Sequence, residues 1–122
     1  MRLRGRAERG QATVEVALVL PVLAVLLLAI GQVIVVGVTE IQVINAARSG
    51  ARAAAVGEPV AKAVQSGSSL DPARTTVTIG RQGAYVTVSV DYRGATDVPL
   101  VGAMVGDTEH SASITMRVET DS

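Results

Sequence analysis

An uncharged run of 24 residues near the N-terminus, residues 16–39, constrains this chain more than any other feature. As an α-helix rising about 1.5 Å per residue, the run is about 36 Å long, enough to cross a hydrocarbon core of about 30 Å. It exceeds the apolar region of about 7–15 residues in a signal peptide, and the nearest small-residue cleavage motifs lie beyond residue 50. We therefore predict a membrane-spanning helix over about residues 16–39 rather than a cleaved secretory signal.

The charges that flank this run predict its orientation. Four arginines and a single acidic residue, Glu8, lie within residues 1–10. Since positively charged flanks stay in the cytoplasm, we expect a single-pass protein of the cytoplasmic (inner) membrane. Its N-terminus would be cytoplasmic, and residues 40–122 would be extracytoplasmic.

The helix is expected to continue beyond the membrane, because residues 40–56 contain no proline and end in an alanine-rich stretch of high helix propensity. Gly57 is suited to the position just after a helix, and Pro59 prevents continuation. These signals predict one long helix over residues 11–57. Pro21 removes one helix hydrogen bond, so we predict a kink at this residue.

Small residues recur every four positions in the second half of this helix, at Ala46, Gly50 and Ala54. A stripe of this kind allows another backbone to approach closely. Two alternatives stay open for it: a helix–helix contact between subunits, or packing of the helix on the chain's own domain. Arg48 and Arg52, also four apart, are interpreted as a polar stripe on the same helix.

Residues 58–122 are expected to form a small extracytoplasmic α+β domain that begins with a short helix over residues 58–66. Alternation of apolar and polar side chains predicts three strands, over residues 75–80, 84–92 and 111–119. Residues 81–83 are interpreted as the turn of a hairpin between the first two strands. An apolar cluster at residues 98–105 is interpreted as a flap or short helical turn over the sheet.

The side chains expected to face the core of this sheet are apolar at every second position: Val77, Ile79, Val86, Val88, Val90, Tyr92, Ala112, Ile114, Met116 and Val118. A sheet of three strands needs a further cover, and the outer half of the long helix is the element that can supply it. The expected fold class is therefore α+β. A long N-terminal transmembrane helix would form a stem, with a small antiparallel sheet of about three strands packed on its outer half like a lollipop.

Composition excludes several function classes. Eleven basic and eleven acidic residues cancel, which argues against a nucleic-acid partner, and the absence of cysteine excludes disulfides, thiolate metal sites and cysteine nucleophiles. The single histidine, His110, lies near Asp107 and Glu109, but without further ligands or a nucleophile it is interpreted as a solvated loop residue. We therefore expect no enzyme activity, no cofactor, no metal and no small-molecule substrate.

Glu15 is the exception among the ionisable residues, because it lies directly before the apolar run. A carboxylate in this position is expensive to bury, so it usually has a partner or a function. The alternative is an interfacial first turn, in which the carboxylate stays hydrated and favours the positive helix N-terminus. Both interpretations stay open on the residues alone.

The boundary around Glu15 resembles the type III signal of pilins and pseudopilins. It reads Arg9-Gly10-Gln11-Ala12-Thr13-Val14-Glu15, followed by VALVLPVL. In that family a basic leader ends in glycine, and a glutamate follows at the fifth mature position. With NAARSGARAAAVG at residues 45–57 and SASITMRVE at residues 111–119, the chain is similar to the TadE-like proteins of tight-adherence (Tad/Flp) pilus systems.

This resemblance implies a function and a set of partners. Residues 1–10 would be a leader peptide, removed after Gly10 by a prepilin peptidase so that Gln11 becomes the first residue. Glu15 would pair with the α-amine of a neighbouring subunit. The chain would be a minor pseudopilin of pilin-like fold that serves in pilus assembly or initiation, with membrane lipid, other pilin or pseudopilin subunits and the assembly platform as partners. The alternative is a signal-anchored envelope protein whose outer domain binds a partner, a function that requires neither Gly10 nor Glu15.

Overall fold

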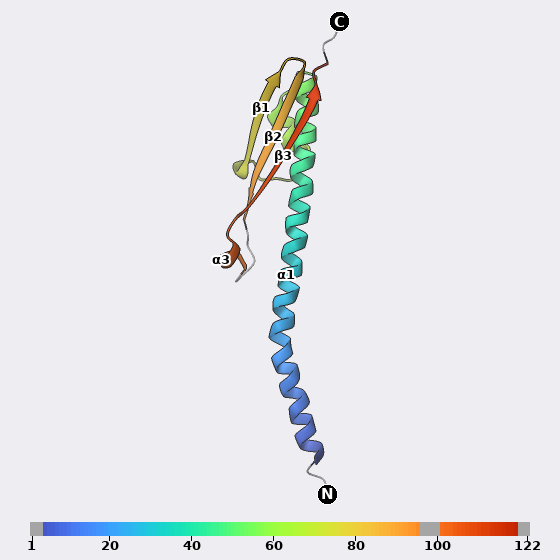
Figure 1. Ribbon diagram of the computed structural model, residues 1–122, viewed down its shortest axis with the longest axis vertical. Coiled ribbons are helices and arrows are strands. Elements are labelled where there is room, and N and C mark those ends of the chain that lie inside the picture. The colour runs from blue at the N-terminus through green and yellow to red at the C-terminus, as the bar shows by residue number, and fades with distance from the viewer. Residues whose placement is uncertain (1–3, 96–100, 120–122) are drawn as a thin grey trace. The chain divides into compact units, whose positions relative to one another are not determined.

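The computed structural model describes residues 4–95 and 101–119, which form helices and one antiparallel sheet (Figure 1). The predicted α+β class is confirmed. In chain order the elements are α1 (Arg4–Ala55), α2 (Val60–Ser66), the 3-10 helix η1 (Pro72–Arg74), β1 (Thr75–Gln82), β2 (Tyr85–Gly94), α3 (Val101–Val105) and β3 (Thr108–Arg117). The chain divides into two compact units, Met1–Ile34 and Val35–Ser122.

Within the first unit, the described chain is a single helix whose side chains are apolar on all sides. The large apolar residues from Val14 to Ile34 are between 41% and 72% exposed, and they point in every direction around the helix axis. Such a helix is suited to a membrane or to a bundle of other helices, not to the surface of a soluble protein. The helix continues through Pro21, and residues Gly10–Ala55 are long and apolar enough to span a membrane.

The C-terminal end of α1 follows the predicted chemistry. Gly57 has a φ of 79°, in the left-handed region that glycine adopts without steric cost. The N–H of Glu58 donates to the carbonyl of Ala53 over 2.8 Å. This hydrogen bond, which spans five residues, is the one that defines a Schellman motif. Pro59 then precedes α2, which begins at Val60 and so starts two residues later than expected.

The sheet has the strand order β1-β2-β3, so β2 lies between two edge strands (Figure 1). All three strands are longer than the alternation predicted. The prediction of a turn at residues 81–83 is wrong, because residues 81 and 82 belong to β1. The turn consists of Gly83, with a φ of 58°, and Ala84. A two-residue connection of this kind matches the twist of adjacent antiparallel strands.

The core of the second unit lies between this sheet and the last turns of α1, with α2 beside them. Val86, Val88 and Val90 of β2 are fully buried, as the alternation predicted. They pack with small residues of α1 and with the larger Val43 and Val64. Burying a valine side chain stabilises a fold by about 1.5 kcal/mol or more, so these side chains hold the sheet on the helix.

The edges of the sheet are covered less completely. Ile79, expected to face the core from β1, is 48% exposed, and the inward apolar side chains of β3 are only partly buried. In the link before β3, residues 101–105 form the short helix α3, but the Met104 side chain is 87% exposed and does not cover the sheet. Residues 98–100 of the expected flap lie outside the described part of the chain.

Candidate functional site

The residues that the sequence marks for processing and pairing lie on the first turns of α1. Gly10, Gln11 and Glu15 are exposed and have helical backbone conformation. Because Gln11 and Glu15 are four residues apart, their side chains lie on the same face of the helix, one turn from each other. Arg2 of the basic segment lies outside the described residues.

Glu15 stands in an almost wholly apolar surface. Its helical neighbours Val14, Val16, Leu18 and Val19 are each about 60% or more exposed, and no other ionisable residue occurs between Arg9 and Glu40. A carboxylate held among such side chains in lipid or in a helix bundle costs several kcal/mol unless a cation or hydrogen-bond donors compensate it. The geometry therefore leaves Glu15 available to a partner that approaches the outside of the helix.

The small-residue stripe is covered by the chain's own domain. Ala46 is fully buried and Ala54 is 3% exposed, both in the core beneath the sheet. A Cβ atom at Gly50 would lie 2.9 Å from Val64 Cγ2 and 3.0 Å from Val88 Cγ1. Of the two alternatives, packing of the helix on the chain's own domain is therefore the one observed. The alternative of a helix–helix contact between subunits through this stripe is wrong, because the sheet already covers these residues. The small residues are needed because they let the sheet and α2 approach the helix axis.

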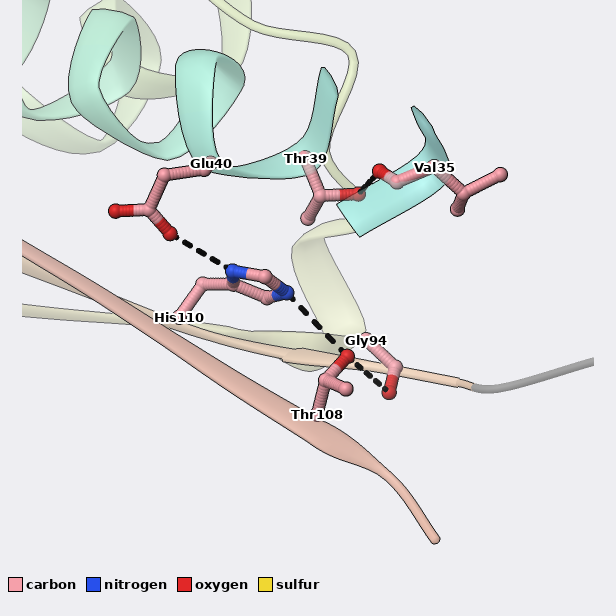
Figure 2. A network of polar contacts seen from close by, with 6 residues as sticks. All are labelled: Val35, Thr39, Glu40, Gly94, Thr108 and His110. Carbon is pink, nitrogen blue, oxygen red and sulfur yellow. Dashed lines mark hydrogen bonds and ion pairs between the residues drawn. The ribbon is translucent and has the colours of Figure 1, made fainter. Parts of the chain in front are cut away.

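His110 corrects another expectation, because it is a strand residue and not a solvated loop residue. It lies on β3, where its ring points toward Glu40 (Figure 2). Its side chain is only 6% exposed. Its Nδ1 atom is 2.8 Å from Oε2 of Glu40 on α1, and its Nε2 atom is 3.3 Å from Oγ1 of Thr108. Because a carboxylate only accepts hydrogen bonds, Nδ1 carries the proton that the Glu40 contact requires. The pair ties the start of β3 to the helix.

One signal in the sequence could have placed His110 on the inward face of the sheet. The inward positions of β3 are even-numbered, so extending the alternation one step back from Ala112 places His110 on the same face. Its partner Glu40 is 70 residues earlier and could not be identified from spacing. Arg48 and Arg52 are exposed, in agreement with the predicted polar stripe.

A hollow lies on the sheet near the start of β3. Its volume is about 500 Å³, and charged side chains of both signs line it, among them Arg74, Asp91, Arg93 and Glu109. Arg93 Nη2 is 3.2 Å from Glu109 Oε1, and both side chains are mostly exposed. Within residues 4–95 and 101–119, no group of three potential metal-ligating side chains comes together.

Comparison with known proteins gives one family. The model of the family described as TadE-like protein matches residues 10–52, which include Gly10, Glu15, the apolar run and the first two residues of the small-residue stripe, Ala46 and Gly50. No curated protein and no solved structure matches the chain at a significant level. Families of this kind serve in Tad pilus assembly as structural components and not as enzymes. The expected resemblance is thus confirmed over residues 10–52, which are TadE-like, and the match does not reach residues 111–119, which also carried the resemblance.

Proposed function

We propose that this chain is a minor pseudopilin of a Tad/Flp-type pilus. It is inserted in the cytoplasmic membrane with its N-terminus inside, cut after Gly10 by a prepilin peptidase, and then taken into a pilus or a pilus-initiating complex. The observation that carries the proposal is Glu15, the one ionisable side chain in the helix surface between Arg9 and Glu40, five residues after Gly10. The proposed partners of the chain are membrane lipid, other pilin or pseudopilin subunits and the assembly platform.

The pairing of Glu15 follows from the cost of unpaired charges in an apolar bundle. After cleavage, Gln11 carries a free α-amine at the start of a helix whose surface is otherwise apolar. A carboxylate and an ammonium group in such surroundings each cost several kcal/mol alone, and together they offset this cost. The lowest free energy belongs to the register in which the N-terminus of one helix lies beside Glu15 of the next.

Cleavage after Gly10 is compatible with the local structure. Gly10 lies inside the continuous helix, and no atom would meet a Cβ added there within 4 Å, so packing does not explain the glycine. Glycine destabilises a helix by about 1 kcal/mol relative to alanine, which makes it easier to unwind this turn into the extended form that a peptidase binds. Removing residues 1–10 takes away four arginines and Glu8, so the net charge changes from 0 to −3. The basic flank that holds the N-terminus in the cytoplasm is then lost.

Substitution of Glu15 tests the proposal. We expect Glu15→Ala to leave membrane insertion and cleavage intact but to lower pilus production by at least ~100-fold, because breaking a buried ion pair costs about 3–5 kcal/mol. Glu15→Asp, which keeps the charge, should restore part of the assembly. Gln32→Ala is the matched control, because it removes the strongly polar side chain elsewhere in the same run. Sheared pili and membrane fractions from the native cell provide the measurement, and full pilus production by Glu15→Ala would refute the pairing.

The second candidate is a signal-anchored envelope protein whose outer domain binds a partner. The fully formed sheet and core of the second unit favour it, because that domain folds around its own helix and leaves much of its polar face exposed. This function predicts that the chain keeps its basic N-terminal segment and tolerates Glu15→Ala. The same experiment therefore separates the two candidates.

A further inference from the structure

Both edges of the sheet are open in the described part of the chain. β1 and β3 each pair with β2 alone, and neither has a second strand partner. Soluble proteins usually protect such edges with charges, prolines or bulges. Residues 111–116 of β3 contain no charge and no proline, and the same holds for residues 75–80 of β1.

The backbone groups that point to the free edge of β3 can be assigned from two hydrogen bonds. The N–H of Val118 donates to Ala84 across the sheet, whereas the N–H of Glu119 donates outward to Ala55 of α1. Since the backbone N–H and C=O groups of successive residues alternate between the two sides of an antiparallel strand, those of the odd-numbered residues of β3 point away from β2, toward the free edge. The free edge of β3 therefore presents the backbone of Ser111, Ser113 and Thr115.

The free edge of β1 presents the complementary set. Gln82 and Tyr85 flank the two-residue turn and pair with each other, so the even-numbered residues of β1 point toward β2. The odd-numbered residues Val77, Ile79 and Arg81 consequently point outward. Their N–H and C=O groups have no partner strand in the described chain.

The registers of the two edges match. Thr78 and Ser113 both pair with Ser89, and Ile79 and Ile114 both pair with Val88, so each couple lies at one level and on one face. β1 and β3 run in the same direction, because each is antiparallel to β2. When two parallel strands pair, only one of the two residues at each level directs its backbone N–H and C=O groups at the other strand. The two edges satisfy this condition at every level from Thr76 and Ser111 to Arg81 and Met116.

We propose that a second copy of this chain adds its β1 to the free edge of β3, in parallel and at the same level, so that the sheet continues from one copy to the next. The junction between the two copies covers apolar side chains that each copy leaves partly exposed. Ile79 is 48% exposed and Ile114 is only partly buried, and they become neighbours on the helix-facing side.

A symmetric pairing of β3 with β3 fits the chain less well. A two-fold axis through that junction makes the strands antiparallel, and it turns the Val35 ends of the two α1 helices in opposite directions. Two copies anchored in one membrane through the residues before Val35 cannot adopt this arrangement. Pairing of β3 with β1 keeps the helices in one direction. Because it joins two different edges, it leaves a free edge on each terminal copy and extends to rows of more than two.

Paired cysteines test the junction directly, because the chain has no cysteine of its own. Thr78 and Ser113 are both exposed, and within one copy they lie on either side of Ser89, about 10 Å apart. This separation exceeds the limit of about 7 Å between Cα atoms of a disulfide, so a bond between these positions joins two copies. Oxidation of the full-length double variant Thr78→Cys/Ser113→Cys in its membrane should give a ladder of dimers, trimers and longer products.

The single variants determine which edges meet. Thr78→Cys and Ser113→Cys should each stay monomeric alone and give only dimers when co-expressed. Dimers of Ser113→Cys alone would overturn the proposal in favour of β3 pairing with β3, and no cross-linking in any combination would overturn it altogether.

A proline on the edge separates edge pairing from collision. Ser111→Pro in the double-cysteine chain removes an N–H that points to the free edge and leaves the hydrogen bonds between β3 and β2 intact. The amount of cross-linked product should therefore fall at least tenfold. Ser111→Ala, which keeps the N–H, is the matched control and should cross-link as before. Equal cross-linking of the proline and alanine variants, with the sheet retained by circular dichroism, would contradict strand addition.

Discussion

His110 and Glu40 show how one polar contact joins two parts of the second unit that are far apart in sequence. The imidazole is 6% exposed and is held from both sides, by the Glu40 carboxylate at 2.8 Å and by the Thr108 hydroxyl at 3.3 Å. The Thr108 hydroxyl oxygen also lies 3.5 Å from the carbonyl oxygen of Gly94. A buried imidazole needs such partners, because an unsatisfied polar group in the interior costs about 1–3 kcal/mol.

We therefore predict that His110→Ala destabilises the second unit by about 1–2 kcal/mol, since it removes a buried hydrogen-bonded side chain and leaves a space beneath β3. Hydrogen exchange of the β2 amides in the full chain in detergent micelles measures the change. Arg93→Ala is the matched control, because the Arg93–Glu109 pair is exposed and contributes at most about 1 kcal/mol. Equal effects of the two substitutions would contradict a structural role for the His110–Glu40 contact.

At the scale of the element, α1 has two kinds of surface because its composition changes along its length. Residues 16–35 are rich in leucine, valine and isoleucine and are apolar all round. From Val43 onward, small residues collect on one side, where alanine and glycine let the sheet come close to the helix axis. The same helix is therefore suited to an apolar environment at one end and to a packed protein core at the other.

Gly50 is where that close packing is most demanding. We predict that Gly50→Ala destabilises the second unit by about 1–3 kcal/mol, because the added Cβ would lie 2.9 Å from Val64 Cγ2 and would push the sheet and α2 outward. Gly37→Ala is the matched control, since no atom lies within 4 Å of a Cβ there and the substitution should stabilise the helix by about 1 kcal/mol. Urea unfolding of the two full-length variants in micelles compares them. A neutral Gly50→Ala would show that the interface can relax.

Elements were predicted well where a local pattern determines them. The alternation in β2 identified Val86, Val88 and Val90, and Gly57 marked the end of α1, because strand faces and helix caps depend on neighbouring residues. The inward position of His110 was missed although the alternation in β3 extends to it, and its partner Glu40 could not be identified because it lies on another element. The partner of the Ala46–Gly50–Ala54 stripe could not be chosen either, because a small-residue face suits a neighbouring helix and the chain's own sheet equally well.

At the scale of the whole molecule, charge and apolar surface are distributed unequally along the chain. Basic residues within residues 1–10 precede a long apolar helix, and acidic residues exceed basic ones in residues 58–122 by eight to five. One cleavage after Gly10 would remove the basic segment and leave Glu15 as the first ionisable side chain. The central claim, that this chain is a processed pseudopilin, depends on that single peptide bond.

The most direct test is the intact mass of the protein from its native membrane, together with mapping of its N-terminal peptide. The proposed function predicts a chain that begins at Gln11, and cyclisation of that glutamine would lower the mass by one ammonia and remove the charge that Glu15 needs as a partner. A chain that still carries the arginines of residues 1–10 would contradict processing and leave a permanently anchored envelope protein.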